Sequence, residues 1–279
     1  MIRNGTGGVQ AVDRALAILR LFARHDAELD LAEISNLAKL PKSTCHRLVA
    51  TLEANGFVAD GGGRGRYRLG LAAAQVGEVA MRQLRPSAAV RDLMEGLCSQ
   101  TKETVGLIVL HGDRVLVIER VESPLPLRMQ DTIGNLLPAH CTASGKLLLA
   151  LTLKDDDEWL RRHNFQAFTA NTITNIERFR SELERIRSNG YSVDNEEYCV
   201  GLFCMSVPVR NHFGDPVAAL SISAPSARAR PDRFPEFLEL LSQCAAEISK
   251  QWLFAPQAPR PAKHLNRRTA NRNAGSLGR

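Results

Sequence analysis

Two segments in the later part of the sequence combine polar side chains with residues that expose the backbone. Residues 138–146 (PAHCTASGK) form a loop that enters a helix, and free N–H groups at a helix start attract carboxylates. Residues 194–204 bring Asp194 and Cys204 close to Ser221 and Ser223, which share one face of a following strand. A carboxylate, a thiol and hydroxyls on one side of a sheet would line a polar pocket for a small molecule. Capped helix starts and ordinary strands produce the same patterns, so neither segment alone establishes a site.

Catalysis and metal binding are the alternative chemistries. Cys204, His140 and Asp194 are the residue types of a thiol-nucleophile triad, although no nucleophile signature surrounds Cys204. Cys199, Cys204, Cys141 and His140 have the residue types of zinc ligands, but a C-x4-C spacing is weak support. A thiol-dependent enzyme therefore stays open as the alternative function, and no cofactor or metal is predicted.

A basic helix face is the third feature that bears on chemistry. In the stretch KSTCHRLVATLEA, the apolar residues Cys45, Leu48, Val49 and Leu52 recur at helical spacing and should pack inward. The opposite face then carries small, polar and basic residues: Lys42, Ser43, His46, Arg47 and Ala50. A helix that lies in the major groove of DNA needs such a face, because bulky side chains would hold it away from the bases.

The flanking residues predict the elements that would hold this helix. Residues 31–57 read as two short helices joined by a tight turn, with Asp30 as the N-cap of the first. Pro41 suits the first turn of the second helix, Ser43 or Thr44 would cap it, and residues 55–56 (Asn-Gly) would end it. Residues 57–69 then form two strands around a glycine-rich hairpin with three arginines, Arg64, Arg66 and Arg68. Together these elements favour a winged helix-turn-helix; an ordinary helical hairpin with a solvated loop is the alternative.

Composition and charge indicate two domains. The chain has 279 residues and 44% hydrophobic residues, enough for two cores, and its longest apolar run, 147–151, is too short to span a bilayer. The N-terminus has no hydrophobic signal region, so a soluble, cytoplasmic protein is expected. Six cysteines without C-x-x-C pairs favour reduced thiols. Basic and acidic residues number 12 and 8 in residues 1–85, 18 and 22 in 86–254, and 6 and 0 in 255–279, which favours a nucleic-acid-facing N-terminal domain.

The predicted organisation has five parts. Residues 1–8 are expected to be disordered, 9–69 to form the winged helix-turn-helix, 70–85 a linker helix, 86–254 an effector-binding domain and 255–279 a disordered basic tail. The first helix, 9–24, would bury Val9, Val12, Ala15, Leu16, Leu19 and Phe22, and the apolar linker helix could contact a second copy of the chain.

The second domain is predicted to be α+β with a central antiparallel sheet. Strands are expected at 104–110, 115–121, 125–129, 191–194, 201–210 and 217–224. Helices are expected at 87–101, 142–151, 154–162, 175–189 and 233–252, and residues 131–140 are expected to form a loop.

Four segments in this order resemble the IclR family of bacterial transcriptional regulators across residues 9–252: LPKSTCHRLVATLEANGFV, PAHCTASGKLLLA, GYSVDNEEYCVGLFCMSVPV and FGDPVAALSIS. The resemblance implies a winged helix-turn-helix, a linker helix and a GAF-like effector-binding domain. It also implies homodimers or homotetramers on palindromic or repeated double-stranded operators, more often repressors than activators.

The resemblance also assigns site residues. It implies DNA contacts by Lys42, Ser43, Thr44, His46, Arg47 and Arg66, and an effector pocket lined by Met129, Ala143, Ser144, Asp194, Leu202, Cys204, Ser221 and Ser223. Cys204 is then a pocket wall. Met205 departs from the small residue that the family often has there. The family's effectors are mostly small carboxylates and aromatic acids. Asp194 would repel an anion unless it is protonated or receives a hydrogen-bond donor from the ligand, so a hydroxyl-bearing acid or aromatic is preferred. Its binding would shift the population between states that space the paired recognition helices differently.

Overall fold

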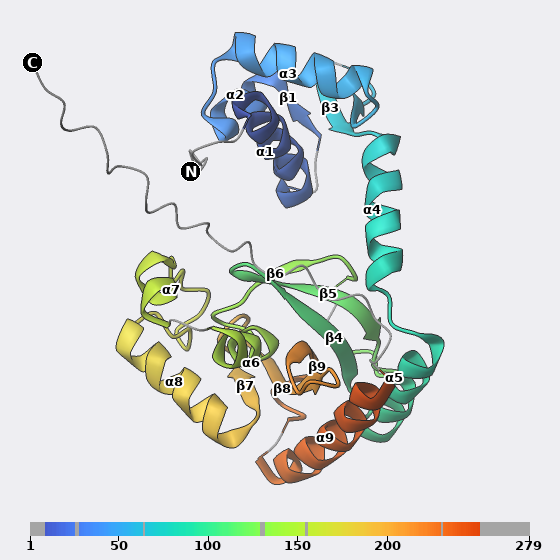
Figure 1. Cartoon of the computed structure of the whole chain (residues 1–279), viewed down its shortest axis with the longest axis vertical. Coiled ribbons are helices and arrows are strands. Elements are labelled where there is room, and N and C mark those ends of the chain that lie inside the picture. Colours follow the sequence, from blue (N-terminus) through green and yellow to red (C-terminus); the bar gives the residue numbers. More distant parts are fainter. Residues whose placement is uncertain are drawn as a thin grey trace, which may run out of the picture. The chain divides into compact units, whose positions relative to one another are not determined.

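The computed structural model describes residues 9–25, 28–63, 65–128, 132–153, 156–229 and 231–251. The predicted disordered segments 1–8 and 255–279 lie outside these ranges. The chain divides into two compact units, residues 1–84 and 85–279, so the helix predicted as a linker belongs to the first unit (Figure 1). None of the helices in the described ranges is both long and apolar enough to cross a membrane.

The first unit is a winged helix-turn-helix, as predicted. Its elements are α1 (Gln10–His25), β1 (Leu29–Asp30), α2 (Leu31–Ala38), α3 (Lys42–Ala54), β2 (Val58–Asp60), β3 (Arg66–Leu69) and α4 (Leu71–Leu84). The strands form an antiparallel sheet in the order β1-β3-β2. The short strand β1, which the sequence did not predict, gives the hairpin a third strand and fixes the wing to the start of α2.

Local signals set the ends of α2 and α3. Asp30 accepts hydrogen bonds from the N–H groups of Ala32 and Glu33, and Glu33 accepts one from the N–H of Asp30, which completes a capping box. The capping role predicted for Ser43 or Thr44 is wrong: Pro41 occupies the N-cap position, and both residues lie within the first turn of α3.

The face that α1 buries differs from the prediction. Val12 and Leu16 are 54% and 45% exposed, whereas Ile18 and Phe22 are buried. Ala15, Ile18, Leu19 and Phe22 also stand at i, i+3, i+4 and i+7, so the sequence permitted two stripes, and packing against α2 and α3 selected the second.

The second unit is a curled antiparallel sheet with helices on both sides. Its elements are α5 (Ala88–Thr101), β4 (Thr104–His111), β5 (Arg114–Val121), β6 (Leu136–Pro138), α6 (Ala143–Thr152), α7 (Asp156–Arg162), α8 (Ile176–Asn189), β7 (Ser192–Asn195), β8 (Leu202–Arg210), β9 (Pro216–Pro225), the 3-10 helix η1 (Pro231–Arg233) and α9 (Phe234–Gln251). The strand order is β6-β5-β4-β9-β8-β7. Helix α6 lies inside the curl with α8 packed on it, and α5 and α9 pack together against the sheet (Figure 1).

Two predictions for this sheet are wrong. Residues 125–127 form bends, and residues 125–128 include no strand. The predicted loop 131–140 contains β6, which pairs with β5. A strand of three residues is too short for its alternation of side chains to be recognised in the sequence. β6 forms because its backbone pairs with the free edge of β5.

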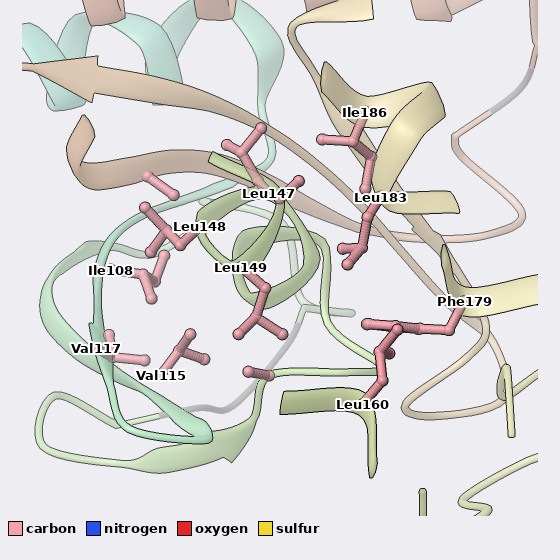
Figure 2. Packing of buried hydrophobic residues seen from close by; sticks show 13 residues of the cluster. Ile108, Val115, Val117, Leu147, Leu148, Leu149, Leu160, Phe179, Leu183 and Ile186 are labelled. Carbon is pink, nitrogen blue, oxygen red and sulfur yellow. The ribbon is translucent and has the colours of Figure 1, made fainter. Parts of the chain in front are cut away.

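Helix α6 is buried on all sides. Figure 2 shows Leu147, Leu148 and Leu149 among Ile108, Val115 and Val117 of the sheet and Phe179, Leu183 and Ile186 of α8. Burying each leucine contributes about 1.5–3 kcal/mol. Gly145 lets this helix approach the preceding loop, because a Cβ there would lie 2.2 Å from the carbonyl oxygen of Ala139. The core therefore holds the N-terminus of α6 firmly against the sheet.

Candidate functional site

Helix α3 presents the predicted basic face to solvent. Cys45, Val49 and Leu52 are buried, and Leu48 is half-buried. The opposite side exposes Lys42, Ser43, His46, Arg47 and Ala50, while Thr44 is half-buried at the edge. The helix can therefore lie in a major groove without displacing its own core, and contacts of these side chains with DNA stay predictions.

The arginines of the wing differ in their surroundings. The Arg66 guanidinium lies 3.4 Å from a carboxylate oxygen of Glu33 and 3.9 Å from one of Glu28, and it also donates to the Glu28 carbonyl. Arg68 is exposed and donates to the Asp60 carbonyl at 3.1 Å, and Arg64 lies outside the described residues. Arg66 thus ties the wing to α2, and its predicted phosphate contact stays a prediction.

Two cross-strand rows of the second unit's sheet face α6. The strand registers align Thr104, Ser223, Cys204 and Asp194 in one row. They align Arg120, Gly106, Ser221, Ser206 and Ser192 in the next. Positions two apart along a strand share a face, so the two rows form one continuous polar surface.

The N-terminus of α6 is fastened to the second row. Ser144 Oγ lies 2.8 Å from Ser206 Oγ, and Ser192 donates to the carbonyl of Ala143 at 2.5 Å. Thr142, the N-cap residue, makes no side-chain cap and instead donates to the Pro138 carbonyl. Sequence reasoning missed Ser192 and Ser206, which could have been found by extending the period-two pattern of Cys204 and Asp194 by two residues.

A cavity of about 50 Å³ opens between the two rows and the start of α6. A cavity that holds a single water has a volume of roughly 10–15 Å³, so this cavity fits a ligand of a few non-hydrogen atoms without rearrangement. Seven of the predicted effector residues line it: Ala143, Ser144, Asp194, Leu202, Cys204, Ser221 and Ser223. Met129 lies outside the described residues. The lining also includes Thr142 of the segment 138–146. It further includes residues that the sequence did not indicate: Thr104, Gly106, Ile108, Val115, Val117, Arg120, Leu137 and Tyr198.

Asp194 is the most perturbed carboxyl group in the cavity. Its Oδ1 accepts hydrogen bonds from the N–H groups of Glu197 at 2.7 Å and Tyr198 at 3.4 Å. Its Oδ2 is buried without a hydrogen-bond partner among the residues that the structure describes. Burial, opposed by these hydrogen bonds, raises the pKa of Asp194 to about 7. Near neutral pH the group can therefore donate a proton or accept one, which removes much of its repulsion toward an anion.

Lys146 forms a buried ion pair behind the cavity. Its side chain is 1% exposed, and its ammonium lies 2.9 Å from Glu182 and in contact with Glu197. The sequence placed Lys146 at a candidate anion site, but these two carboxylates hold it inside the structure. Burial opposes ionisation of Glu182, but hydrogen bonds and charge attraction from Arg185 and Lys146 outweigh it and lower the pKa of Glu182.

Cys204 and Asp194 are cross-strand neighbours, but His140 does not complete a thiol triad with them. The two ring nitrogens of His140 lie 2.9 Å from the Gln166 carbonyl and 3.0 Å from a ring nitrogen of His163. Cys204 instead donates to Ser223 Oγ at 3.2 Å. Within the described ranges, no cluster of three or more His, Cys, Asp or Glu side chains is arranged to hold a metal ion.

Comparison with known proteins shows where this architecture belongs. Residues 11–61 match the IclR helix-turn-helix domain, and residues 80–250 match the bacterial transcriptional regulator IclR C-terminal domain. The chain is 32% identical over 247 residues to the transcriptional repressor IclR of Escherichia coli, covering 88% of this chain and 90% of the relative. It is 34% identical over 243 residues to the transcriptional regulator XynR of the same organism, covering 87% and 96%.

A solved structure extends the likeness to a ligand-bound protein. An IclR homologue from Microbacterium hydrocarbonoxydans in complex with 4-hydroxybenzoate aligns with a TM-score of 0.70 and 25% identity, over 88% of this chain and 100% of that one. The two domain matches together span most of the chain, in the order that the structure shows. The chain therefore belongs to the IclR family of bacterial transcriptional regulators.

Proposed function

We propose that the protein is a repressor that binds an operator through α3 and the wing and responds to a small organic acid in the cavity beside α6. The observation that carries the proposal is the pairing of an exposed basic recognition face in one unit with a polar cavity in the other. Repression follows the E. coli relative named as a repressor. The acid class follows the 4-hydroxybenzoate complex of the homologue.

We also infer a homodimer or homotetramer in the cytoplasm, where the operator is. The apolar side chains of α4 support self-association, since Leu71, Val76 and Val79 are exposed at 83%, 60% and 45%. Symmetric oligomers present two recognition helices to two half-sites, and effector binding would alter their spacing.

The test is fluorescence anisotropy of the full-length protein on DNA from upstream of its own gene, against scrambled DNA, over a salt series. We expect specific binding with a negative salt slope. Arg47→Ala should reduce the preference for operator over scrambled DNA about 5- to 150-fold, the value of one good base contact. Arg20→Ala, which removes an equal charge from the exposed surface of α1, is the control. Equal binding to both DNAs by the unaltered protein would contradict the proposal.

A thiol-dependent enzyme is the second candidate that the sequence left open, and the observed geometry disfavours it. Burial, with the nearby Asp194 and Glu197 carboxylates, raises the pKa of the Cys141 thiol far above its usual range, and His140 does not reach Cys204. A thiol titration of the folded protein would overturn this view if Cys204 or Cys141 reacted as a thiolate at neutral pH.

A further inference from the structure

The turn between α2 and α3 contains a lysine in a backbone conformation that favours glycine. Lys39 ends α2 with a φ of 54° and a ψ of 43°, which lie in the left-handed region. A residue with a Cβ is crowded by the following carbonyl oxygen there, so glycine is the usual residue at such a position. Gly190 ends α8 of the same chain in this way, with a φ of 76°. Lysine at position 39 therefore costs the fold stability that glycine would not cost.

The hydrogen bonds of the turn need the left-handed backbone but not the lysine side chain. The N–H of Lys39 donates to the carbonyls of Ser35 and Asn36. The N–H of Leu40 donates to the Ser35 carbonyl at 3.1 Å. Leu40 is buried, and Pro41 then occupies the N-cap position of α3. Glycine at position 39 would form the same turn, so the geometry of the turn does not explain why the residue is lysine.

The position of Lys39 beside the recognition helix offers an explanation. Lys39 is exposed and stands three residues before Lys42, the exposed first residue of α3. When the N-terminal residues of a recognition helix contact bases in the major groove, the preceding helix crosses the phosphate backbone. The turn that joins the two helices then lies at the edge of the groove. A flexible ammonium group at this point can neutralise a phosphate.

We propose that Lys39 binds a DNA phosphate, and that this contact is the reason for a lysine at a position that favours glycine. The inference rests on the proposed binding of DNA through α3 and the wing, and it adds a contact outside both elements. Phosphates are the same in every sequence. Lys39 therefore contributes affinity for any duplex and no preference for the operator.

A second lysine provides a matched control. Lys102 ends α5 with a φ of 61°, is exposed and belongs to the second unit. Both lysines stand at the carboxyl end of a helix, where the helix dipole favours a cation. Replacement of either lysine by glycine thus removes the same kind of strain, the same kind of dipole interaction and one positive charge. Only the replacement of Lys39 should change DNA binding.

The experiment measures the melting temperature of the full-length protein by calorimetry and its affinity for a scrambled DNA duplex over a salt series. Lys39→Gly and Lys102→Gly should each raise the melting temperature of the unit that carries the change by about 2–4 °C. The relief of strain should outweigh the larger backbone entropy that glycine loses on folding. Lys39→Gly should also weaken DNA binding about 5- to 10-fold at about 0.1 M salt and reduce the salt slope by about 1. Lys102→Gly should leave the affinity and the slope unchanged.

Two further variants separate the charge of Lys39 from the strain. Lys39→Gln keeps the Cβ, so it should lose the same DNA affinity without the gain in melting temperature, whereas Lys39→Arg should keep the affinity. Unchanged affinity and salt slope in Lys39→Gly and Lys39→Gln would overturn the phosphate contact, and so would an equal loss of affinity in Lys102→Gly. A lower melting temperature of Lys39→Gly would overturn the claim that the lysine costs stability. These results leave the proposed function standing, whereas the lack of salt-dependent DNA binding by the unaltered protein would contradict both proposals.

Discussion

Asp194 should make the stability of the effector domain fall as pH rises. In the folded protein the Asp194 carboxyl has a pKa of about 7, against an ordinary value of 3.8 for aspartate. At a pH between these two pKa values, Asp194 is protonated in the folded chain and ionised in the unfolded chain. Unfolding then liberates a proton, so stability from this group is present at low pH and is lost toward pH 7, by about 1.4 kcal/mol per unit.

The perturbation is Asp194→Asn, which keeps an oxygen acceptor for the N–H groups of Glu197 and Tyr198 and removes the titration. Integrated from pH 5 to pH 8.5, the aspartate should cost the unaltered protein about 3 kcal/mol of unfolding free energy. The variant lacks this loss and should become relatively more stable at the higher pH.

Urea unfolding at both pH values, followed by circular dichroism, measures the difference. Asp92→Asn, which alters an exposed carboxyl on α5, controls for a general change in net charge. If the unaltered protein and Asp194→Asn showed the same dependence on pH, the carboxyl would be ionised throughout, and the reasoning about its burial would be refuted.

Three further predictions follow from the buried contacts and the wing. Lys146→Met should destabilise by about 3–5 kcal/mol in urea, because Glu197 and Glu182 lose their buried counter-charge; a loss below about 1 kcal/mol would contradict this. Gly145→Ala should lower the melting temperature sharply or prevent folding, whereas Gly96→Ala, with open space around it, should be neutral or slightly stabilising. Lys42→Gln should reduce the salt slope of DNA binding by about 1, and Arg66→Gln by less, because Glu28 and Glu33 already offset the charge of Arg66; equal reductions would show that Arg66 reaches a phosphate.

Features that depend on neighbours in the chain were predictable from the sequence alone. The turn and stop of the helix-turn-helix follow from residues such as Asp30 and Gly56, whose preferences act within one helical turn. The inward face of α3 follows from its period, because Cys45, Val49 and Leu52 define a single stripe. The alternation of Ser221 and Ser223 likewise placed both hydroxyls on one side of β9.

Tertiary structure decided whatever depends on partners far along the chain. Two stripes were available on α1, and only packing chose between them. Pairing of β5 with β4 skips Ile118 in a β-bulge, and Arg120 rather than Glu119 is among the residues that line the cavity. The raised pKa of Asp194 and the burial of Lys146 likewise depend on segments folded around them. Strand register, burial and pKa depend on residues from the whole fold. For that reason the sequence indicated the polar residues of the site, but not their burial or the protonation state of Asp194.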